Sequence, residues 1–261
     1  MFLLISEFDR FKLDQTSCRH VRLSSLFESI RFGTHLIEGR RPIFRERLPA
    51  GDLEHPVVFL RIASLGEADG LIDWQVIRED MGRRNDNLPV REIDADDILQ
   101  PTDYLISMRG TPRGFSLLRS GLRDIPEDLK RAGLSVAASN NFILMRPYPD
   151  GDRNIDFLHL MLDVLIGDMK DAYENVRKGG VPPAYLSGIR SITNANGPAS
   201  TQTGNFIGVR DLKTLTLNIP VEREARERFW MEYEKLLDSE REARMNLLKF
   251  RTNFRDIFSL Q

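Results

Sequence analysis

Apolar residues along the chain fall into short continuous runs and into longer stretches with a helical period. The runs VVFLRI at 57–62, YLI at 104–106 and LTLNIP at 215–220 are short and rich in branched or aromatic residues, which predicts buried strands. The segment SVAASNNFILMRP at 135–147 predicts another strand, interrupted by the polar triplet SNN. In EADGLIDW, at 67–74, Asp-Gly lies between two candidate strands and predicts a hairpin.

Two internal stretches show the helical period. The segment 20–39 places Leu23, Leu26, Phe27 and Ile30 on one helical face, and Gly33 is a plausible end. The segment 156–180 is apolar nearly all round, at Phe157, Leu158, Leu160, Met161, Val164 and Leu165. The second stretch therefore predicts a core helix that ends at the Gly-Gly pair 179–180.

The residues from Val221 onward contain neither glycine nor proline and repeat apolar positions in alternating steps of four and three. This is a heptad pattern with a break at Glu240, and a helix over 221–260 would be about 60 Å long. Either the helix packs on its own domain or it needs a partner helix. The second alternative predicts an antiparallel two-fold dimer through Phe229, Tyr233, Leu236, Ala243, Leu247, Phe250, Phe254 and Ile257.

These patterns predict an α+β protein. Residues 1–220 are expected to form one globular domain with a mixed or antiparallel sheet and packed helices. Residues 221–261 are expected to form a long coiled-coil helix.

Composition narrows the class of protein. The 261 residues are 41% hydrophobic and 29% charged, with a formal net charge of −2, so any binding of nucleic acid must come from a local basic patch. The single cysteine, Cys18, excludes an intrachain disulfide. The apolar run at the N-terminus is too short for a signal peptide, and no segment has the roughly 20 apolar residues of a membrane helix. We therefore expect a cytoplasmic protein.

Arginines gather on two stretches that glycine and proline punctuate. EGRRPIFRERLPAG, at 38–51, is predicted to be a loop, and DYLISMRGTPRGFSLL, at 103–118, runs from a buried strand into a second loop. Such a loop can be a phosphate cradle, a nucleic-acid contact or a solvated turn. We expect one concave face to carry Arg40, Arg41, Arg45, Arg47, Arg109, Arg113 and Arg119.

Catalytic patterns are missing from the sequence. The glycine-containing loops lack the lysine followed by Ser or Thr of a phosphate-binding loop, and GFSLLRSG at 114–121 does not fit Gly-x-Ser-x-Gly. The histidines do not have the spacing of a helical metal site. The sequence thus predicts a protein without catalytic activity of its own, cofactor or metal. A nucleic-acid-binding module and a dimeric scaffold that contacts only proteins both remain open.

The order of the segments resembles the target recognition domain in the specificity subunit of type I restriction–modification enzymes. The segments that carry the resemblance are VRLSSLFESIRFG, VVFLRIASL, GLIDW, DYLISMRGTPRG, AASNNFILMRP, DFLHLMLDVL and LTLNIP, followed by the long helix. Family members have two recognition domains and two spacer helices, whereas this chain has one of each, so it resembles a half-size subunit.

The resemblance implies that the chain reads one half of a bipartite site in double-stranded DNA and directs a DNA methyltransferase subunit. Dimerisation through the helix would rebuild a two-domain reader. Besides the arginines above, the implied DNA contacts are Thr111, Ser139, Asn140, Asn141, Asn194, Asn196, Thr201, Gln202 and Thr203. The same polar residues are also common in ordinary surface loops.

Overall fold

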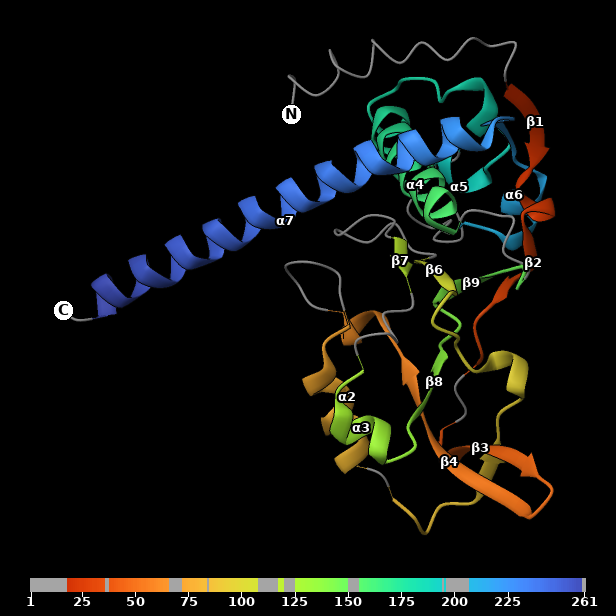
Figure 1. The fold of residues 1–261 in the computed structure, drawn as a ribbon, viewed down its shortest axis with the longest axis vertical. Coiled ribbons are helices and arrows are strands. Elements are labelled where there is room, and N and C mark those ends of the chain that lie inside the picture. The colour runs from red at the N-terminus through yellow and green to blue at the C-terminus, as the bar shows by residue number, and fades with distance from the viewer. Residues whose placement is uncertain are drawn as a thin grey trace. The chain divides into compact units, whose positions relative to one another are not determined.

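Figure 1 shows the computed structural model of the chain, which describes residues 18–35, 38–65, 72–83, 85–107, 117–119, 125–149, 155–193, 195 and 207–259. The strands are β1 (Cys18–Arg22), β2 (Phe27–Phe32), β3 (Arg41–Leu48), β4 (Gly51–Leu60), β5 (Val90–Glu92), β6 (Tyr104–Ser107), β7 (Leu117–Arg119), β8 (Ser135–Ala138), β9 (Phe142–Pro147) and β10 (Thr216–Pro220). The α-helices are α2 (Trp74–Gly82), α3 (Glu127–Arg131), α4 (Ile155–Arg177), α5 (Arg190–Thr193), α6 (Val209–Thr214) and α7 (Arg223–Ser259). Strands and helices mix without a repeating order, which is the predicted α+β class.

The described strands form two four-stranded sheets and one two-stranded sheet. In the order β2-β9-β6-β7, every neighbouring pair is antiparallel. The order β5-β3-β4-β8 is mixed, because β3 and β4 are antiparallel while β5 and β8 run parallel to their neighbours. Strand β1 pairs with β10. Since β8 and β9 belong to different sheets, the chain crosses from one sheet to the other at residues 139–141.

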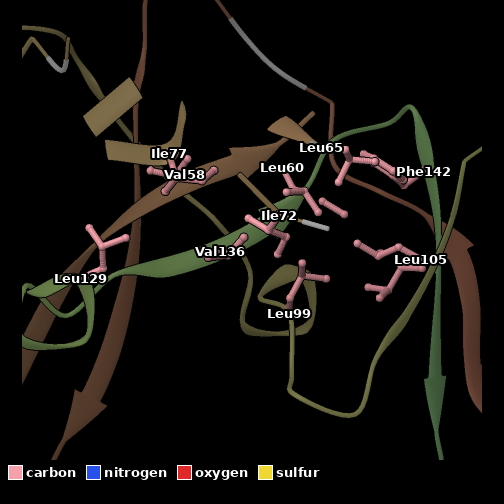
Figure 2. Packing of buried hydrophobic residues seen from close by; sticks show 12 residues of the cluster. Val58, Leu60, Leu65, Ile72, Ile77, Leu99, Leu105, Leu129, Val136 and Phe142 are labelled. Carbon is pink, nitrogen blue, oxygen red and sulfur yellow. The ribbon is translucent and has the colours of Figure 1, made fainter. Parts of the chain in front are cut away.

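One hydrophobic core joins the two larger sheets to helices α2 and α3 (Figure 2). Its labelled side chains are Val58, Leu60, Leu65, Ile72, Ile77, Leu99, Leu105, Leu129, Val136 and Phe142. Because side chains alternate along a strand, the residues between them face a second cluster of Val57, Phe59, Ile93 and Ala137. The end of β4 is therefore buried on both faces, which explains the unbroken apolar run at 57–60.

Strand β2 replaces the helix that the apolar spacing at 20–39 predicts. A β-bulge between Phe27 and Ser29 adds one residue to the strand. The buried side chains Phe27 and Ile30 consequently lie three positions apart instead of two. Three is also the spacing of a helical face, so the sequence pattern is misleading here.

Strand β3 replaces the arginine-bearing loop predicted at 38–51. It forms a hairpin with β4, in register from Ile43 opposite Pro56 to Leu48 opposite Gly51. The loop prediction is wrong because the glycines and prolines that bound the segment mark the ends of β3 and the hairpin turn rather than a continuous loop. In the hairpin, arginines on one strand face carboxylates on the next, so the charges are compatible with a strand.

The Asp-Gly signal at 67–74 leads into a helix rather than a second strand. Leu65 and Ile72 form one antiparallel bridge, and residues 66–71 lie outside the described part. The Asp73 carboxylate then accepts hydrogen bonds from the backbone N–H groups of Gln75 (2.9 Å) and Val76 (3.4 Å). This N-cap begins α2 at Trp74.

Several predicted elements are confirmed. The runs at 57–62, 104–106 and 215–220 lie in β4, β6 and β10, and the polar triplet in 135–147 separates β8 from β9. The core helix is α4, although Val164 is 52% exposed. It ends in a Schellman motif, with Gly179 at φ +88° and the N–H of Gly180 bound to the Asn175 carbonyl at 2.9 Å. Among the described residues, no helix is long and apolar enough to span a membrane.

The chain divides into two compact units. One comprises residues 21–153 and 162–217 and contains both larger sheets with their core. The other comprises 1–20, 154–161 and 218–261. In this second unit the first turns of α7 contact the first turns of α4, where the rings of Trp230 and Tyr233 lie 6.2 and 6.3 Å from His159.

Helix α7 has 37 residues, which is about 55 Å. Phe229, Tyr233 and Leu236 of the predicted dimerisation stripe are half-buried, and Ala243 is exposed. The side chains of Leu247, Phe250, Phe254 and Ile257 lie outside the description. The long helix is thus present where the heptad pattern predicts it, and its pairing as a coiled coil stays a prediction, as does a domain boundary at Val221.

Candidate nucleic-acid interface

The ends of several strands meet at one place, which we call the strand-end corner and define as residues 33–35, 60–61, 107 and 139–142. The N–H of Ser139 donates to the Leu60 carbonyl (3.0 Å), which joins the ends of β8 and β4. The N–H of Thr34 donates to the Ala138 carbonyl at 2.8 Å, which adds the segment after β2. Because β8 is parallel to β4, these chain segments all leave the sheets in the same direction.

The antiparallel sheet reaches the same corner. The N–H of Gly33 donates to the Phe142 carbonyl at 2.9 Å, and Ser107, the last residue of β6, pairs with Phe142, the first residue of β9. The loop after β6 therefore starts beside the turn 139–141. It also returns there, since Leu117 pairs with Ile106 at the same end of β6.

Glycine is required at position 33 by this packing. A Cβ at Gly33 would lie 2.2 Å from the carbonyl oxygen of Ser139 and 2.6 Å from that of Ala138. Both atoms belong to the backbone of β8 and its turn, so neither can move aside without shifting a strand end. The missing side chain lets the segment after β2 lie directly on the turn, and it brings His35 within reach of Asn140.

Polar and cationic side chains surround the corner. Asn140 and His35 are exposed, and the amide nitrogen of Asn140 donates to Nδ1 of His35 at 2.9 Å. Arg91 of β5 donates through Nη1 to the His35 carbonyl (2.6 Å). Arg61, directly after β4, is exposed, and its side chain forms no ion pair with the described residues. The corner thus offers hydrogen-bonding groups together with positive charge.

The residues expected at 139–141 differ in their access to solvent. Asn140 is exposed and Asn141 is half-buried, whereas Ser139 is 0% exposed. The hydroxyl oxygens of Ser139 and Thr34 are buried, and neither has a hydrogen-bond partner among the described residues. The Ser139 side chain is therefore shielded from solvent, and Ser139 contributes to the turn through its backbone.

The arginines expected on one face are not all together. Arg40 lies just before β3 and Arg41 at its start, whereas Arg45 and Arg47 lie toward the hairpin tip, about 13 and about 20 Å from Arg41 along the strand. Arg45 pairs with Glu54 (2.7 Å) and Glu92 (3.7 Å), and its bond with Glu54 raises the pKa of the guanidinium.

The other hairpin arginines also have acidic neighbours. Arg47 lies opposite Asp52 in the β3–β4 register, and Arg41 is 3.8 Å from Asp86. The hairpin outside the corner is therefore close to neutral. Near its tip, Leu48 and Leu53 are 44% and 48% exposed.

The remaining expected contacts fall largely outside the described residues. Arg119 lies in β7, two positions from its end at the corner, and its side chain is not described. The residues with no described placement are Arg109, Thr111, Arg113, Asn194, Asn196, Thr201, Gln202 and Thr203. For the first three, the structure gives only where their loop begins and ends, which is at the corner.

A buried ion pair supports the strand that leads to this loop. Asp103 is 0% exposed and accepts from Nε (3.0 Å) and Nη2 (2.9 Å) of Arg146 in β9. It also accepts from the N–H of Gln100 at 2.7 Å, and Arg146 Nη2 donates to the Ile98 carbonyl (2.8 Å). The bond with Asp103 raises the pKa of Arg146, and the bidentate contact ties the residue before β6 to β9.

Sequence reasoning did not find His35, Arg61, Arg91 or the Asp103–Arg146 pair. His35 and Asn140 are 105 positions apart, and nothing in either local sequence links them. For the ion pair, the only signal in the sequence is Asp103 itself, which opens the segment 103–118. Within the described part of the chain, no group of His, Cys, Asp and Glu side chains is placed to hold a metal ion.

Among known proteins, solved structures alone include chains similar to this one. The chain matches no protein-family model and no curated protein. It is similar to a chain in a solved structure described as "Structural basis underlying complex assembly and conformational transition of the type I R-M system", with a TM-score of 0.44 and 14% identity. The match covers 94% of this chain and 45% of the other, so this chain spans less than half the length of that protein.

Proposed function

We propose that the chain is a DNA-recognition subunit that binds one half-site of a duplex through the strand-end corner and the loop at 108–116. The observation that carries this proposal is the meeting of three features at one place. These are the exposed Asn140–His35 pair, the cations Arg61 and Arg91, and both ends of a loop with two more arginines. Arginine binds phosphate or guanine, and asparagine binds base edges, so the set combines positioning with readout.

Charge supports DNA binding at the corner rather than along the hairpin. With a net charge of −2, the chain needs a local basic patch to bind a polyanion. Carboxylates accompany Arg45 along the β3–β4 ladder, and a phosphate contact there would have to displace Glu54. We therefore leave Arg45, Arg47 and the buried Ser139 out of the proposed interface. Arg40, which is exposed and lies just before β3, stays in it.

The chain itself is proposed to be non-catalytic and to direct a DNA methyltransferase subunit, as the order of its sequence segments suggests. In this proposal the system is of the restriction–modification type, and α7 pairs two copies so that two recognition domains face a bipartite site. The support for pairing is the heptad pattern together with the length of α7. Two copies related by a two-fold axis would read an inverted repeat.

A scaffold that binds only proteins is the alternative, and the exposed Leu48 and Leu53 near the neutral hairpin tip favour it. Selection from a pool of random-sequence duplexes by the full-length chain distinguishes the two functions. The proposal predicts enrichment of one short half-site, or of two inverted copies at a fixed spacing. Recovery of duplexes without any common sequence, or of none, contradicts it and favours the scaffold.

A further inference from the structure

The bond between Asn140 and His35 fixes how an exposed amide is oriented. The Asn140 amide nitrogen lies 2.9 Å from Nδ1 of His35. An amide NH₂ can only donate, so Nδ1 is the acceptor in this bond. With one N–H engaged, the amide of Asn140 keeps a second N–H and a carbonyl oxygen that are not used in this bond.

This side-chain pair is not what holds the turn. The backbone already fixes it, because the N–H of Phe142 donates to the Ser139 carbonyl (3.0 Å) and the N–H of Ser139 donates to Leu60. The contact of Gly33 with the Ser139 backbone adds a third constraint. A hydrogen bond between two exposed side chains adds little to stability. Its effect is to orient the amide on a rigid stretch of backbone, which is what specific recognition requires.

The free donor and acceptor of the amide match one base. In the major groove, adenine presents an acceptor at N7 beside a donor at N6, while guanine presents two acceptors. Cytosine offers a donor and thymine an acceptor and a methyl group, so neither satisfies both atoms of the amide. We infer that Asn140 reads an adenine in the major groove and that His35 is the positioning residue that orients it.

The neighbouring cations agree with this assignment, which rests on the proposed DNA-binding function. Arg91 uses Nη1 for the His35 carbonyl and retains other N–H groups, and Arg61 follows the strand end that bonds to Ser139. Both can contact the phosphates that flank a base held at Asn140. The order of the sequence segments indicates neither a role for His35 nor which base Asn140 contacts.

The test uses the full-length chain and a duplex that it selects, with each base pair replaced in turn by the three others. Dissociation constants come from fluorescence anisotropy. At one position the wild type should prefer adenine by roughly 5- to 150-fold, and Asn140→Ala should abolish this preference. Asn140→Asp, an acceptor only, should shift it to cytosine. His35→Ala should reduce it in part, and Asn87→Ala, an exposed asparagine before β5, should leave it unchanged.

Unchanged base preferences at every position in both Asn140 variants would overturn the inference while leaving DNA binding intact. A wild type that binds no duplex, or all duplexes equally, would instead overturn the proposed function. Circular dichroism checks the fold of each variant. If Asn140→Ala is unfolded, the change from adenine to cytosine in Asn140→Asp and the partial loss in His35→Ala decide the matter.

Discussion

At the scale of single residues, the buried pair Asp103–Arg146 determines how β6 meets β9. Removing one partner leaves an uncompensated charge in the core, which costs about 3–5 kcal/mol. Asp103→Ala should therefore lower the free energy of unfolding by that amount in urea denaturation. The matched control is Asp128→Ala, which breaks an exposed bidentate pair with Arg78 at 2.9 and 3.0 Å. The urea midpoint of Asp128→Ala should hardly move. Equal losses of unfolding free energy in the two variants would show that the burial of Asp103 does not set the cost of removing it.

Gly33 allows a second test at this scale. Gly33→Ala places a methyl group 2.2 Å from the Ser139 carbonyl oxygen, so a strand end must shift. We expect a loss of about 1–3 kcal/mol in unfolding free energy, together with weaker duplex binding. Gly167→Ala, in α4 with nothing within 4 Å of the added Cβ, should instead stabilise by roughly 0.5–1 kcal/mol. A neutral Gly33→Ala would show that the close packing at the corner is not required.

At the scale of elements, local patterns predict what local interactions decide. The runs that became β4, β6 and β10 are buried and apolar, and the glycine pair after α4 forms the expected helix end. The errors come from non-local contacts. The bulge in β2 depends on β9, more than a hundred positions away, and the strand state of β3 depends on ion pairs with β4 and β5.

The candidate site shows the same division between local and distant information. Asn140 was recognisable as a polar interruption between two strands. Its partner His35 and the cation Arg91 reach it only through the arrangement of β2, β5 and β8. The order of segments along the chain suggests the proposed class of function. It did not indicate which polar side chains meet.

The β3–β4 hairpin carries a prediction of its own. Because Arg45 is paired with Glu54 and Arg47 lies opposite Asp52, replacing both arginines by alanine should leave duplex affinity and its salt dependence unchanged. Electrophoretic mobility shifts at two salt concentrations measure both the duplex affinity and its salt dependence. A marked loss of affinity would place the hairpin at the DNA and would restore the arginine face expected from the sequence.

At the scale of the whole molecule, we propose that α7 sets how many copies of the chain act together. If the heptad stripe pairs two copies, light scattering should give twice the mass of the chain at micromolar concentration. Leu247→Asp should give a monomer, since a buried charge opposes pairing. Asn246→Asp, an exposed neighbour, should remain dimeric. A monomeric wild type would exclude the homodimer and leave the helix of another protein as the partner.

The most direct measurement is the salt dependence of duplex binding by the intact chain. Each phosphate contact contributes about −0.9 to the slope of log K against log salt. Affinity should fall steeply with salt, and Arg61→Ala should reduce the slope by about one. Arg131→Ala, an exposed arginine on α3, before the start of β8 and thus away from the corner, should keep the wild-type slope. No duplex binding at the lowest salt, or equal slopes for the wild type and Arg61→Ala, would contradict DNA recognition at the strand-end corner.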